Sequence, residues 1–421
     1  MTSVASVFVG CKISQADGEQ ALAELTAAGM HAAGRHDEAD VVVVHTCCVT
    51  AEAERKSRRL ARRYSRLGRR VIVAGCAARF RPEQFAGDGI EVPPTPDWAA
   101  VAATGVTRES GPAPAGEPGA APTGSFSAAE AAGRTRLVLK VQDGCSGRCS
   151  YCAVRLVRGE ARSTPLTEVL ATARAGLARG CGEIVISGID LGAWRDGERT
   201  LPDLVAALAE LPDLLRLRLS SLEPRHVDER LLEALALPTV ARHLHLPLQS
   251  ADDAVLAAMR RPYSVAGYMA TAERVRARLG DGMLSTDLIV GFPAEDEAAF
   301  ARTLATLESG LFGRAHVFAF SPRPGTAAAK LPPLPVAVVK ERMARALAAA
   351  QAAAGAARAA ALGRQAEILV EDRLHGLWRG YSSEYIPYYL RGEASPGKLV
   401  GAVAGREHED GVMGEVKEAG R

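Results

Sequence analysis

The most constraining feature of this 421-residue chain is a stretch in which three cysteines, Cys145, Cys149 and Cys152, lie within eight residues. They follow the apolar run 137–141 closely, and flanking glycines allow the loop to wrap tightly. Thiolates are the preferred ligands of iron–sulfur clusters and of zinc. A structural zinc ion needs four protein ligands, whereas three thiolates on a four-iron cluster leave one iron open to another ligand. The spacing therefore predicts a metal-binding loop with one coordination position unaccounted for.

Composition limits the class of protein. With 48% apolar residues, the chain has enough apolar side chains for the cores of about two to four domains. No run of about 18 apolar residues predicts a membrane span, and residues 1–10 do not resemble a signal peptide. We therefore expect a soluble, cytoplasmic protein without a membrane partner. Because cytosolic thiols stay reduced, the eight cysteines are expected to be ligands or redox groups rather than disulfides.

Residues 1–110 are predicted to form an α/β domain with a parallel sheet. Short apolar runs at 6–10, 41–46 and 71–75 alternate with helical patterns at 15–29 and 51–68. Each run is followed at once by a cysteine: Cys11, Cys47 with its neighbour Cys48, and Cys76. Ligands bind beyond the carboxyl ends of parallel strands, so the cysteines are expected to converge on a second three-thiolate site. The alternative for any one of them is a buried cysteine that only packs.

The helical pattern after Cys48 is strongly basic. Nine Lys and Arg side chains face two glutamates between residues 51 and 70. Charge of one sign favours contact with a phosphate backbone, although a charge run is also typical of a solvated helix face. The candidate RNA contacts on this helix are Arg55, Arg58, Arg59, Arg62 and Arg63.

A linker and a second α/β region follow. Residues 111–133 are a Pro/Ala/Gly linker with almost nothing to bury. From 134 to 334, strand patterns at 137–142, 183–188, 215–220, 243–248, 284–291 and 315–320 alternate with helical segments such as 166–179 and 251–259. This predicts a partial (β/α)6 barrel with its chemistry at the carboxyl ends of the strands. Polar residues lie at those ends, although each one singly is as simply explained as a cap or loop residue: Ser187, Asp190, Ser220, Ser221, Glu223, Gln249, Ser250, Glu295, Ser321 and Arg323.

The remaining residues predict a connector and a small β-barrel. Residues 335–364 are rich in alanine and are expected to form a long helix. Residues 365–421 contain strand patterns at 366–370, 385–390 and 398–403, which suits a β-barrel of oligonucleotide-binding size. Its aromatic residues either stack on bases or pack in and on the barrel: Trp378, Tyr381, Tyr385, Tyr388 and Tyr389. From residue 364 onward eight basic side chains face ten acidic ones, so this segment is not basic overall.

The cysteine loop, with Tyr151 just before its third cysteine, resembles the radical S-adenosylmethionine signature Cys-x3-Cys-x2-Cys. The order of an N-terminal three-cysteine domain, a radical domain and a terminal barrel of the TRAM type resembles the methylthiotransferase branch of that superfamily. Several runs are most similar to the enzymes that act on N6-threonylcarbamoyladenosine in tRNA: Lys-Val-Gln-Asp-Gly-Cys (140–145), Leu-Arg-Leu-Ser-Ser-Leu-Glu-Pro (217–224), His-Leu-Pro-Leu-Gln-Ser (245–250), Thr-Asp-Leu-Ile-Val-Gly-Phe-Pro (286–293) and Phe-Ser-Pro-Arg-Pro-Gly-Thr (320–326). The Ser-Ser-Leu-Glu-Pro run favours this branch over relatives that act on isopentenyladenosine or on a ribosomal protein.

Two segments depart from the family pattern. The usual Asn-Thr-Cys-Thr is His45-Thr46-Cys47-Cys48 here, so either of two adjacent thiols is available as the ligand, and position favours Cys47. The usual Val-Asn after the first cysteine and lysine is replaced by Ile13-Ser14.

The resemblance implies two 4Fe-4S clusters and S-adenosylmethionine. The cluster on Cys145, Cys149 and Cys152 would bind S-adenosylmethionine and generate a radical, because C2 of adenine has no acidic proton for ordinary base catalysis. The second cluster, on Cys11, Cys47 and Cys76, would deliver the sulfur, and a second S-adenosylmethionine the methyl group. The residues assigned to the S-adenosylmethionine pocket are Tyr151, Ser187, Ser220, Glu223, Gln249 and Ile289.

The resemblance also implies partners. The anticodon stem-loop of tRNA would contact the basic helix together with Arg155, Arg158 and Arg162, which follow the cysteine loop. An electron-donor protein such as flavodoxin or ferredoxin would reduce the cluster. One alternative is the same chemistry on isopentenyladenosine tRNA or a ribosomal protein. An alternative from another class is a non-catalytic RNA-binding protein whose cysteines hold structural zinc.

Overall fold

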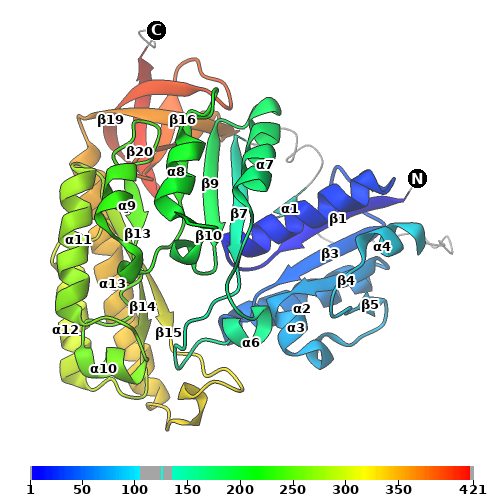
Figure 1. The fold of residues 1–421 in the computed structure, drawn as a ribbon, viewed down its shortest axis with the longest axis horizontal. Helices are drawn as coiled ribbons and strands as arrows, with labels where there is room; N and C mark the ends of the chain where they lie inside the picture. The colour runs from blue at the N-terminus through cyan, green and yellow to red at the C-terminus, as the bar shows by residue number, and fades with distance from the viewer. Residues whose placement is uncertain (1, 105–124, 127–134, 418–421) are drawn as a thin grey trace.

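The computed structural model describes residues 2–104, 125–126 and 135–417. Three bodies follow one another along the chain: an N-terminal α/β domain, a central α/β half-barrel, and a C-terminal β-barrel (Figure 1). This confirms the predicted fold class. The predicted linker 111–133 lies outside the described residues except for 125–126.

The N-terminal domain is built on a sheet ordered β2-β1-β3-β4-β5, in which every one of these pairings is parallel. Its main strands are β1 (Ser3–Phe8), β3 (Val41–Thr46) and β4 (Arg70–Gly75), with β2 (His31–Ala32) and β5 (Ile90–Glu91) at the edges. The short β6 (Ser125–Phe126) pairs antiparallel with β1. The first predicted strand, 6–10, therefore begins three residues earlier and ends at Phe8.

Helices cover both faces of this sheet because successive residues of β3 point to opposite sides. Val41 and Val43 pack with Leu22 and Leu25 of α1 (Lys12–Ala27) and with α4 (Trp98–Thr104). On the other face, Val42 and Val44 pack with α2 (Ala51–Arg66) and α3 (Cys76–Phe80), which leads into the 3-10 turn η1 (Pro82–Phe85). Thr50 caps α2 by accepting a hydrogen bond from the Ala53 backbone N–H.

The central domain is a curved sheet of six parallel strands that stays open on one side. The strands are β7 (Arg136–Asp143), β9 (Glu183–Gly188), β12 (Arg216–Leu219), β13 (His243–His245), β14 (Met283–Val290) and β15 (Arg314–Ala319). They form two ladders, β12-β9-β7 and β13-β14-β15, which are joined by isolated parallel bridges from Leu217 to Val240 and from Ser221 to His245. The predicted strand 243–248 ends at His245, after which the chain passes to Gln249 at a positive φ of 67°.

Helices line the outer face of the half-barrel. They are α7 (Leu166–Ala178), α8 (Leu201–Ala209), α9 (Glu229–Ala234), α10 (Asp253–Ala258), α11 (Val265–Leu279) and α12 (Glu297–Glu308). Smaller elements fill the connections: α6 (Val154–Arg158), β8 (Arg162–Ser163), η2 (Leu191–Ala193), β10 (Arg195–Asp196), β11 (Arg199–Thr200), η3 (Pro224–His226) and η4 (Ala328–Lys330).

Strand alternation makes the inner face of the half-barrel polar. Apolar side chains such as Leu217, Leu244 and Leu288 point outward into the core under the helices. The alternate positions point inward, and most of them are polar: Arg136, Lys140, Gln142, Glu183, Ser187, Arg218, His243, His245, Ser285, Asp287, Arg314 and His316. The half-barrel therefore presents charged and hydrogen-bonding groups, rather than an apolar lining, to whatever enters it.

The C-terminal barrel closes the amino-terminal end of the half-barrel. Helix α13 (Val336–Ala361) leads to a closed barrel ordered β16-β17-β18-β20-β19. Its strands are β16 (Gln365–Leu374), β17 (Leu377–Ser382), β18 (Pro387–Arg391), β19 (Leu399–His408) and β20 (Gly411–Lys417). The sequence patterns predicted three of these five strands. Within the described residues, no helix combines the length and the apolar character needed to cross a membrane.

Burial corrects the base-stacking alternative for two of the barrel aromatics, Tyr388 and Tyr389. Tyr388 belongs to the barrel core and Tyr389 is 4% exposed. Tyr381 and Tyr385 face the half-barrel, where the Arg136 guanidinium lies 4.9 Å from the centre of the Tyr381 ring and that of Arg218 lies 4.4 Å from the centre of the Tyr385 ring.

Candidate active site

The first cysteine loop joins β7 to α6 and is fixed by hydrogen bonds at both ends. Gly144 has a φ of +70°, and a Cβ there would overlap the Glu160 carbonyl oxygen, so only glycine fits. The Ser150 backbone N–H donates to the Met259 carbonyl at 2.9 Å, and the Ser150 hydroxyl donates to that of Ala258 at 2.7 Å. Burial raises the pKa of the Cys152 thiol to about 12, and the neighbouring charges of Cys149 and Cys145 act in the same direction. The three thiols therefore lie close together.

A buried arginine supplies positive charge to this loop. Arg261, only 3% exposed, donates from Nη1 to Cys149 Sγ at 3.3 Å and to the Tyr151 hydroxyl at 3.4 Å. Its Nη2 lies 2.5 Å from both carboxylate oxygens of Glu223. Sequence reasoning missed Arg261; the only sequence signal is that it follows the helical segment 251–259. A guanidinium at this position stabilises the negative charge of bound thiolates.

Two of the residues predicted for the S-adenosylmethionine pocket, Tyr151 and Glu223, are tied to this loop by hydrogen bonds from Arg261. Tyr151 and Ile289 both pack against the apolar cluster that contains Met259 and Phe292. Ser187, the last residue but one of β9, is buried, and the Gln249 carbonyl accepts a hydrogen bond from the Ile289 backbone N–H at 2.9 Å. The buried Ser220 Oγ has no hydrogen-bond partner among the described residues. A buried hydroxyl without a partner at the carboxyl end of a strand fits a site that receives a polar ligand, and the individual ligand contacts stay a prediction.

Asp190 is a second polar residue beside the loop, and the sequence predicted it only as a polar residue at the end of a strand. Asp190 Oδ2 lies 3.9 Å from Cys145 Sγ, and the Asp190 N–H donates to Gln142 Oε1 at 2.8 Å. Arg225 and His226 pair with the two Asp190 oxygens at 2.7 and 3.0 Å. Sequence reasoning missed Arg225 and His226, which lie in the segment after β12. A third strand end therefore contributes side chains to the surroundings of the cysteine loop.

The second cysteine set lies at three adjacent strand ends of the N-terminal domain, as predicted. Cys11 precedes α1 and is exposed, Cys47 follows β3, and Cys76 is the first residue of α3. Burial raises the pKa of Cys47 to about 12, with the charges of Cys11 and Cys76 acting in the same direction, so the three thiols are neighbours. Gly10 has a φ of +126°, and a Cβ there would lie 2.6 Å from Cys47 Cβ. The loop is therefore shaped to bring Cys11 and Cys47 together.

Cys48 points in a different direction from Cys47. It is fully buried in the core beneath α2 and α3, and it hydrogen-bonds Cys76, which raises the pKa of Cys48 and lowers that of Cys76. Cys47 instead borders Gly10 and accepts from the Val49 N–H at 3.5 Å. This favours Cys47 as the ligand, an assignment that stays a prediction.

The structure contradicts the predicted RNA contact of Arg158. Its side chain is 3% exposed and donates to Cys76 Sγ at 2.9 Å, to the Asp143 carboxylate at 3.0 and 3.1 Å, and to Asp17 at 2.7 Å. A buried guanidinium shared among these acceptors has no face left for a phosphate. Arg158 instead ties the two cysteine sites together.

The other predicted RNA contacts lie on accessible surface. Arg55, Arg59 and Arg62 are exposed, whereas Arg63 is half-buried, and so is Arg58, which donates to Gln84 Oε1 at 2.6 Å. Arg155 pairs with Glu160 beside the cysteine loop. The basic helix therefore presents an exposed row of guanidinium groups, and its contact with RNA stays a prediction.

Each cysteine set offers three thiolates, one fewer than the four protein ligands of a structural zinc ion, and this suits a four-iron cluster with one iron left open. The choice between a cluster and zinc stays a prediction.

A parallel half-barrel with Cys-x3-Cys-x2-Cys after its first strand defines a radical S-adenosylmethionine enzyme. The comparisons agree: residues 139–307 match the Radical SAM superfamily and residues 3–92 match the Uncharacterized protein family UPF0004. A tRNA-2-methylthio-N(6)-dimethylallyladenosine synthase of Novosphingobium aromaticivorans is 35% identical over 93% of this chain and 92% of its own. The Threonylcarbamoyladenosine tRNA methylthiotransferase MtaB of Thermotoga maritima is 32% identical over 93% and 91%. The chain therefore belongs to the radical S-adenosylmethionine tRNA methylthiotransferase family.

A solved structure with much lower sequence identity has a similar fold. A radical S-adenosylmethionine methyltransferase, TsrM, from Kitasatospora setae aligns with a TM-score of 0.53 at 13% identity, covering 76% of this chain and 73% of its own. At this identity the likeness supports the fold alone. Family membership implies 4Fe-4S clusters and S-adenosylmethionine as cofactors, which when bound supply the radical that breaks an unactivated C–H bond. The chain's own residues would supply the thiolates that hold the clusters, and Arg261 contributes positive charge beside Cys149.

Proposed function

We propose that this protein inserts a methylthio group at C2 of N6-threonylcarbamoyladenosine next to the anticodon of tRNA. The observation that carries the proposal is the charged inner face of the half-barrel. Lys12, at the start of α1, reaches it, with its Nζ 5.6 Å from the centre of the Tyr385 ring, beside Arg136, Glu183 and Arg218. A threonylcarbamoyl group brings a carboxylate, a hydroxyl and a urea to such a surface. A dimethylallyl group would desolvate these charges without replacing their hydrogen bonds, which is costly.

Nucleoside mass spectrometry of tRNA from cells that lack this protein tests the proposal. We expect the 2-methylthio form of threonylcarbamoyladenosine to disappear and its unmethylthiolated precursor to accumulate. Expression of the protein from a plasmid should restore the modified form, and persistence of that form in the deletion strain would rule the proposal out.

The second candidate is the same reaction on N6-dimethylallyladenosine. It is favoured by identity, because the Novosphingobium relative is slightly more similar to this chain than the Thermotoga one. The same deletion experiment separates the two candidates, since each predicts the loss of a different methylthiolated nucleoside.

We also propose that the exposed row on α2 contacts the RNA backbone. Arg59→Ala combined with Arg62→Ala should weaken binding of an anticodon stem-loop and reduce the slope of log K against log salt by about two, because each lost phosphate contact removes about one. The matched control is Arg174→Ala with Arg179→Ala on α7, which removes the same charge from an exposed outer helix end. Equal salt slopes for the two double variants would contradict this contact.

In this proposal the reaction takes place in the cytoplasm, where tRNA and reduced thiols coexist. An electron-donor protein of the flavodoxin or ferredoxin type would supply the reducing electron. Residues 365–421 would serve as the TRAM-type module. Because acidic side chains outnumber basic ones there, α2 would provide most of the electrostatic attraction to RNA.

A further inference from the structure

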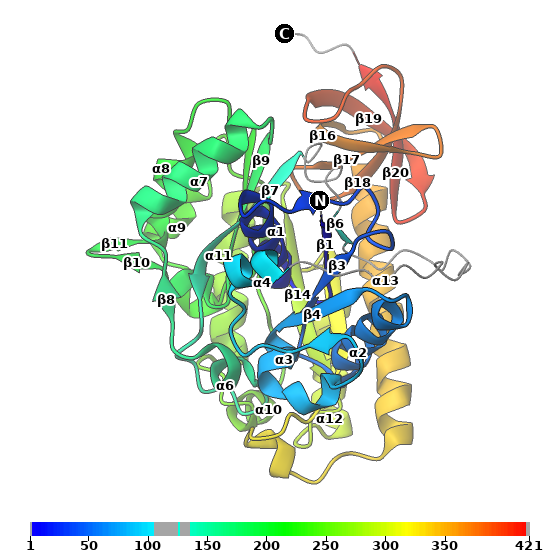
Figure 2. The ribbon, with the colours of Figure 1, turned by 90° about the vertical axis from the view of Figure 1, so that its right-hand side faces the viewer.

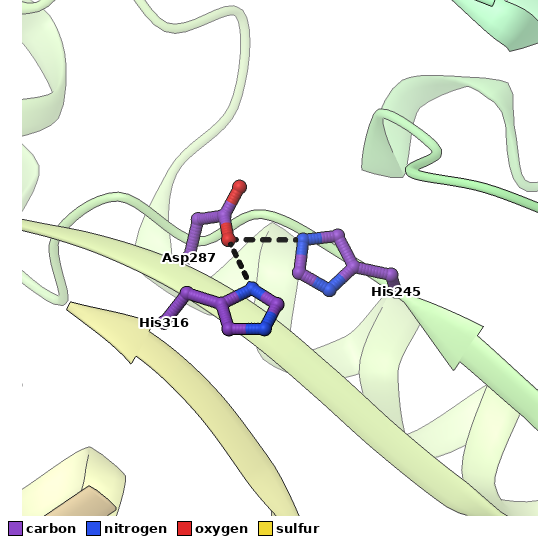
Figure 3. Close-up of side chains that lie close together, drawn as sticks. All are labelled: His245, Asp287 and His316. Atoms are coloured by element: carbon purple, nitrogen blue, oxygen red, sulfur yellow. Dashed lines mark hydrogen bonds and ion pairs between the residues drawn. The ribbon is translucent and has the colours of Figure 1, made fainter. Parts of the chain in front are cut away.

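Two histidines and an aspartate converge on the inner face of the half-barrel, outside both cysteine sites (Figure 3). His245 Nε2, from β13, lies 3.2 Å from Asp287 Oδ1 on β14. His316 Nδ1, from β15, lies 3.1 Å from the same oxygen. The two imidazole rings are 5.5 Å apart. Asp287 and Ile289, a residue predicted for the S-adenosylmethionine pocket, are two residues apart on β14, so their side chains share one face of the strand.

A buried chain of hydrogen bonds determines which ring nitrogens of these histidines donate and which accept. A carboxylate only accepts, so the ring nitrogens of His245 and His316 that face Asp287 both carry hydrogens. Ser285 Oγ lies 2.9 Å from His245 Nδ1 and 2.8 Å from His243 Nε2, so one hydroxyl satisfies both rings. Despite burial, hydrogen bonds from His245 and His316 hold the pKa of Asp287 below its usual range.

The outer end of this chain is open. The His316 side chain is 45% exposed, and on the same edge strand Phe318 is 40% exposed and Arg314 is also exposed. Within the described part of the chain, Asp287 Oδ2 accepts no hydrogen bond. The cluster therefore has a buried, ordered end at His243 and an accessible end at His316 and Asp287.

The contacts favour a hydrogen-bonding surface over a cation site. Each histidine already donates to Asp287 Oδ1, and His245 is oriented by Ser285 from behind. A metal ion at this point would have to displace both hydrogens. Two further cations, Lys12 and Arg314, act on the same group of residues, because their charges add to burial and to Arg218 in lowering the pKa of His243.

We propose that Asp287 and His316, with His245 as a positioning residue, form the subsite that reads the N6 substituent of the target adenosine. This inference rests on the proposed function and names the residues that select its substrate class. Urea N–H groups match the acceptors of Asp287, and the carboxylate of the substituent matches the cationic Lys12 and Arg314. Phe318 offers a ring face on which a nucleobase can stack. An aliphatic substituent leaves Asp287 desolvated and unpaired, which selects against it.

The experiment compares wild type, His316→Leu and Arg314→Met on stem-loop RNAs that carry either threonylcarbamoyladenosine or dimethylallyladenosine. We expect each variant to lose about ten- to hundredfold in kcat/KM on the threonylcarbamoyl RNA, because charge-assisted hydrogen bonds contribute on that scale. Formation of 5′-deoxyadenosine without RNA should stay at the wild-type rate. The control His31→Leu changes an exposed histidine on edge strand β2 and should leave both readouts unchanged.

The outcomes are distinguishable. A loss confined to the threonylcarbamoyl RNA supports the subsite. Unchanged activity of both variants on that RNA, an equal loss on both RNAs, or a stoichiometric metal ion lost with His316→Leu would each overturn it. A wild-type enzyme that modifies only the dimethylallyl RNA would instead defeat the proposed function itself.

Discussion

Replacing Cys145, Cys149 and Cys152 together with alanine is expected to halve the iron content and abolish cleavage of S-adenosylmethionine. If each three-cysteine set holds one four-iron cluster, the wild-type chain carries about eight irons and this variant about four. In this prediction the remaining iron is bound by Cys11, Cys47 and Cys76. Anaerobic purification with iron and sulfide analysis, followed by chromatographic measurement of 5′-deoxyadenosine, checks both parts of the prediction.

The reciprocal variant gives the sharper contrast. Alanine at Cys11, Cys47 and Cys76 should also leave about four irons, yet 5′-deoxyadenosine should still form while methylthio transfer is lost. Cys181→Ala, which changes a cysteine outside both sets, serves as the control and should keep all the iron. Stoichiometric zinc in place of iron in the wild-type protein would contradict the cluster assignment and support the zinc-binding alternative.

Local patterns predicted much of this fold because its strands are short, apolar and regularly spaced. The predicted bounds of the strands 41–46 and 183–188 equal the observed ones, because buried parallel strands are near-continuous apolar runs bounded by polar residues. Strand β17 was missed because its Trp378-Arg379-Gly380 segment gives no apolar alternation and takes its shape from barrel closure. Strand β13 was overextended because Leu246 and Leu248 stay buried after the ladder ends.

The candidate site was predictable only where chemistry follows a short spacing. The cysteines and the strand-end residues met that condition. Arg261, Arg225 and Lys12 did not, because each acquires its role from a partner far away in sequence, such as Cys149 for Arg261 or Tyr385 for Lys12. The charge of a single arginine does not show whether it will face solvent or a buried carboxylate, which is why Arg158 was placed wrongly.

Several polar contacts join the N-terminal domain to the half-barrel, and Figure 2 shows that domain lying across its strands. Lys140 of β7 pairs with Asp17 of α1. Arg323, predicted to line the mouth, instead pairs with Glu54 of α2, and Ser321 Oγ accepts from the Ala51 N–H at 3.0 Å. These contacts fix the second cysteine set relative to the first, so the relative position of the two sites depends on a few charged side chains.

Arg158 is the most consequential of these side chains, and Arg158→Met is expected to destabilise the protein by about 1 to 3 kcal/mol, because partly buried acceptors lose a charged hydrogen-bond donor. Methionine fills much of the same volume but removes one of the two cations that pair with Asp17 and Asp143, which keep Lys140. Methylthio transfer should fall by about a hundredfold, because a displacement of about 1 Å between reacting groups costs that much. Cleavage of S-adenosylmethionine should fall less, since the first cysteine loop keeps its contacts to Arg261, Met259 and Ala258.

Arg155→Met is the matched control for this prediction. It lies one turn earlier on the same short helix, makes the same change of side chain, and pairs with Glu160 at the surface. Surface pairs contribute little to stability, so its unfolding transition should match that of the wild type. Thermal unfolding separates the two variants. Because Arg155 is itself a predicted RNA contact, the ratio of methylthiolated RNA to 5′-deoxyadenosine for Arg158→Met is compared with that of the wild type. If Arg158→Met lowers both reactions equally at unchanged stability, then Arg158 acts only within the first loop and does not couple the two cysteine sites.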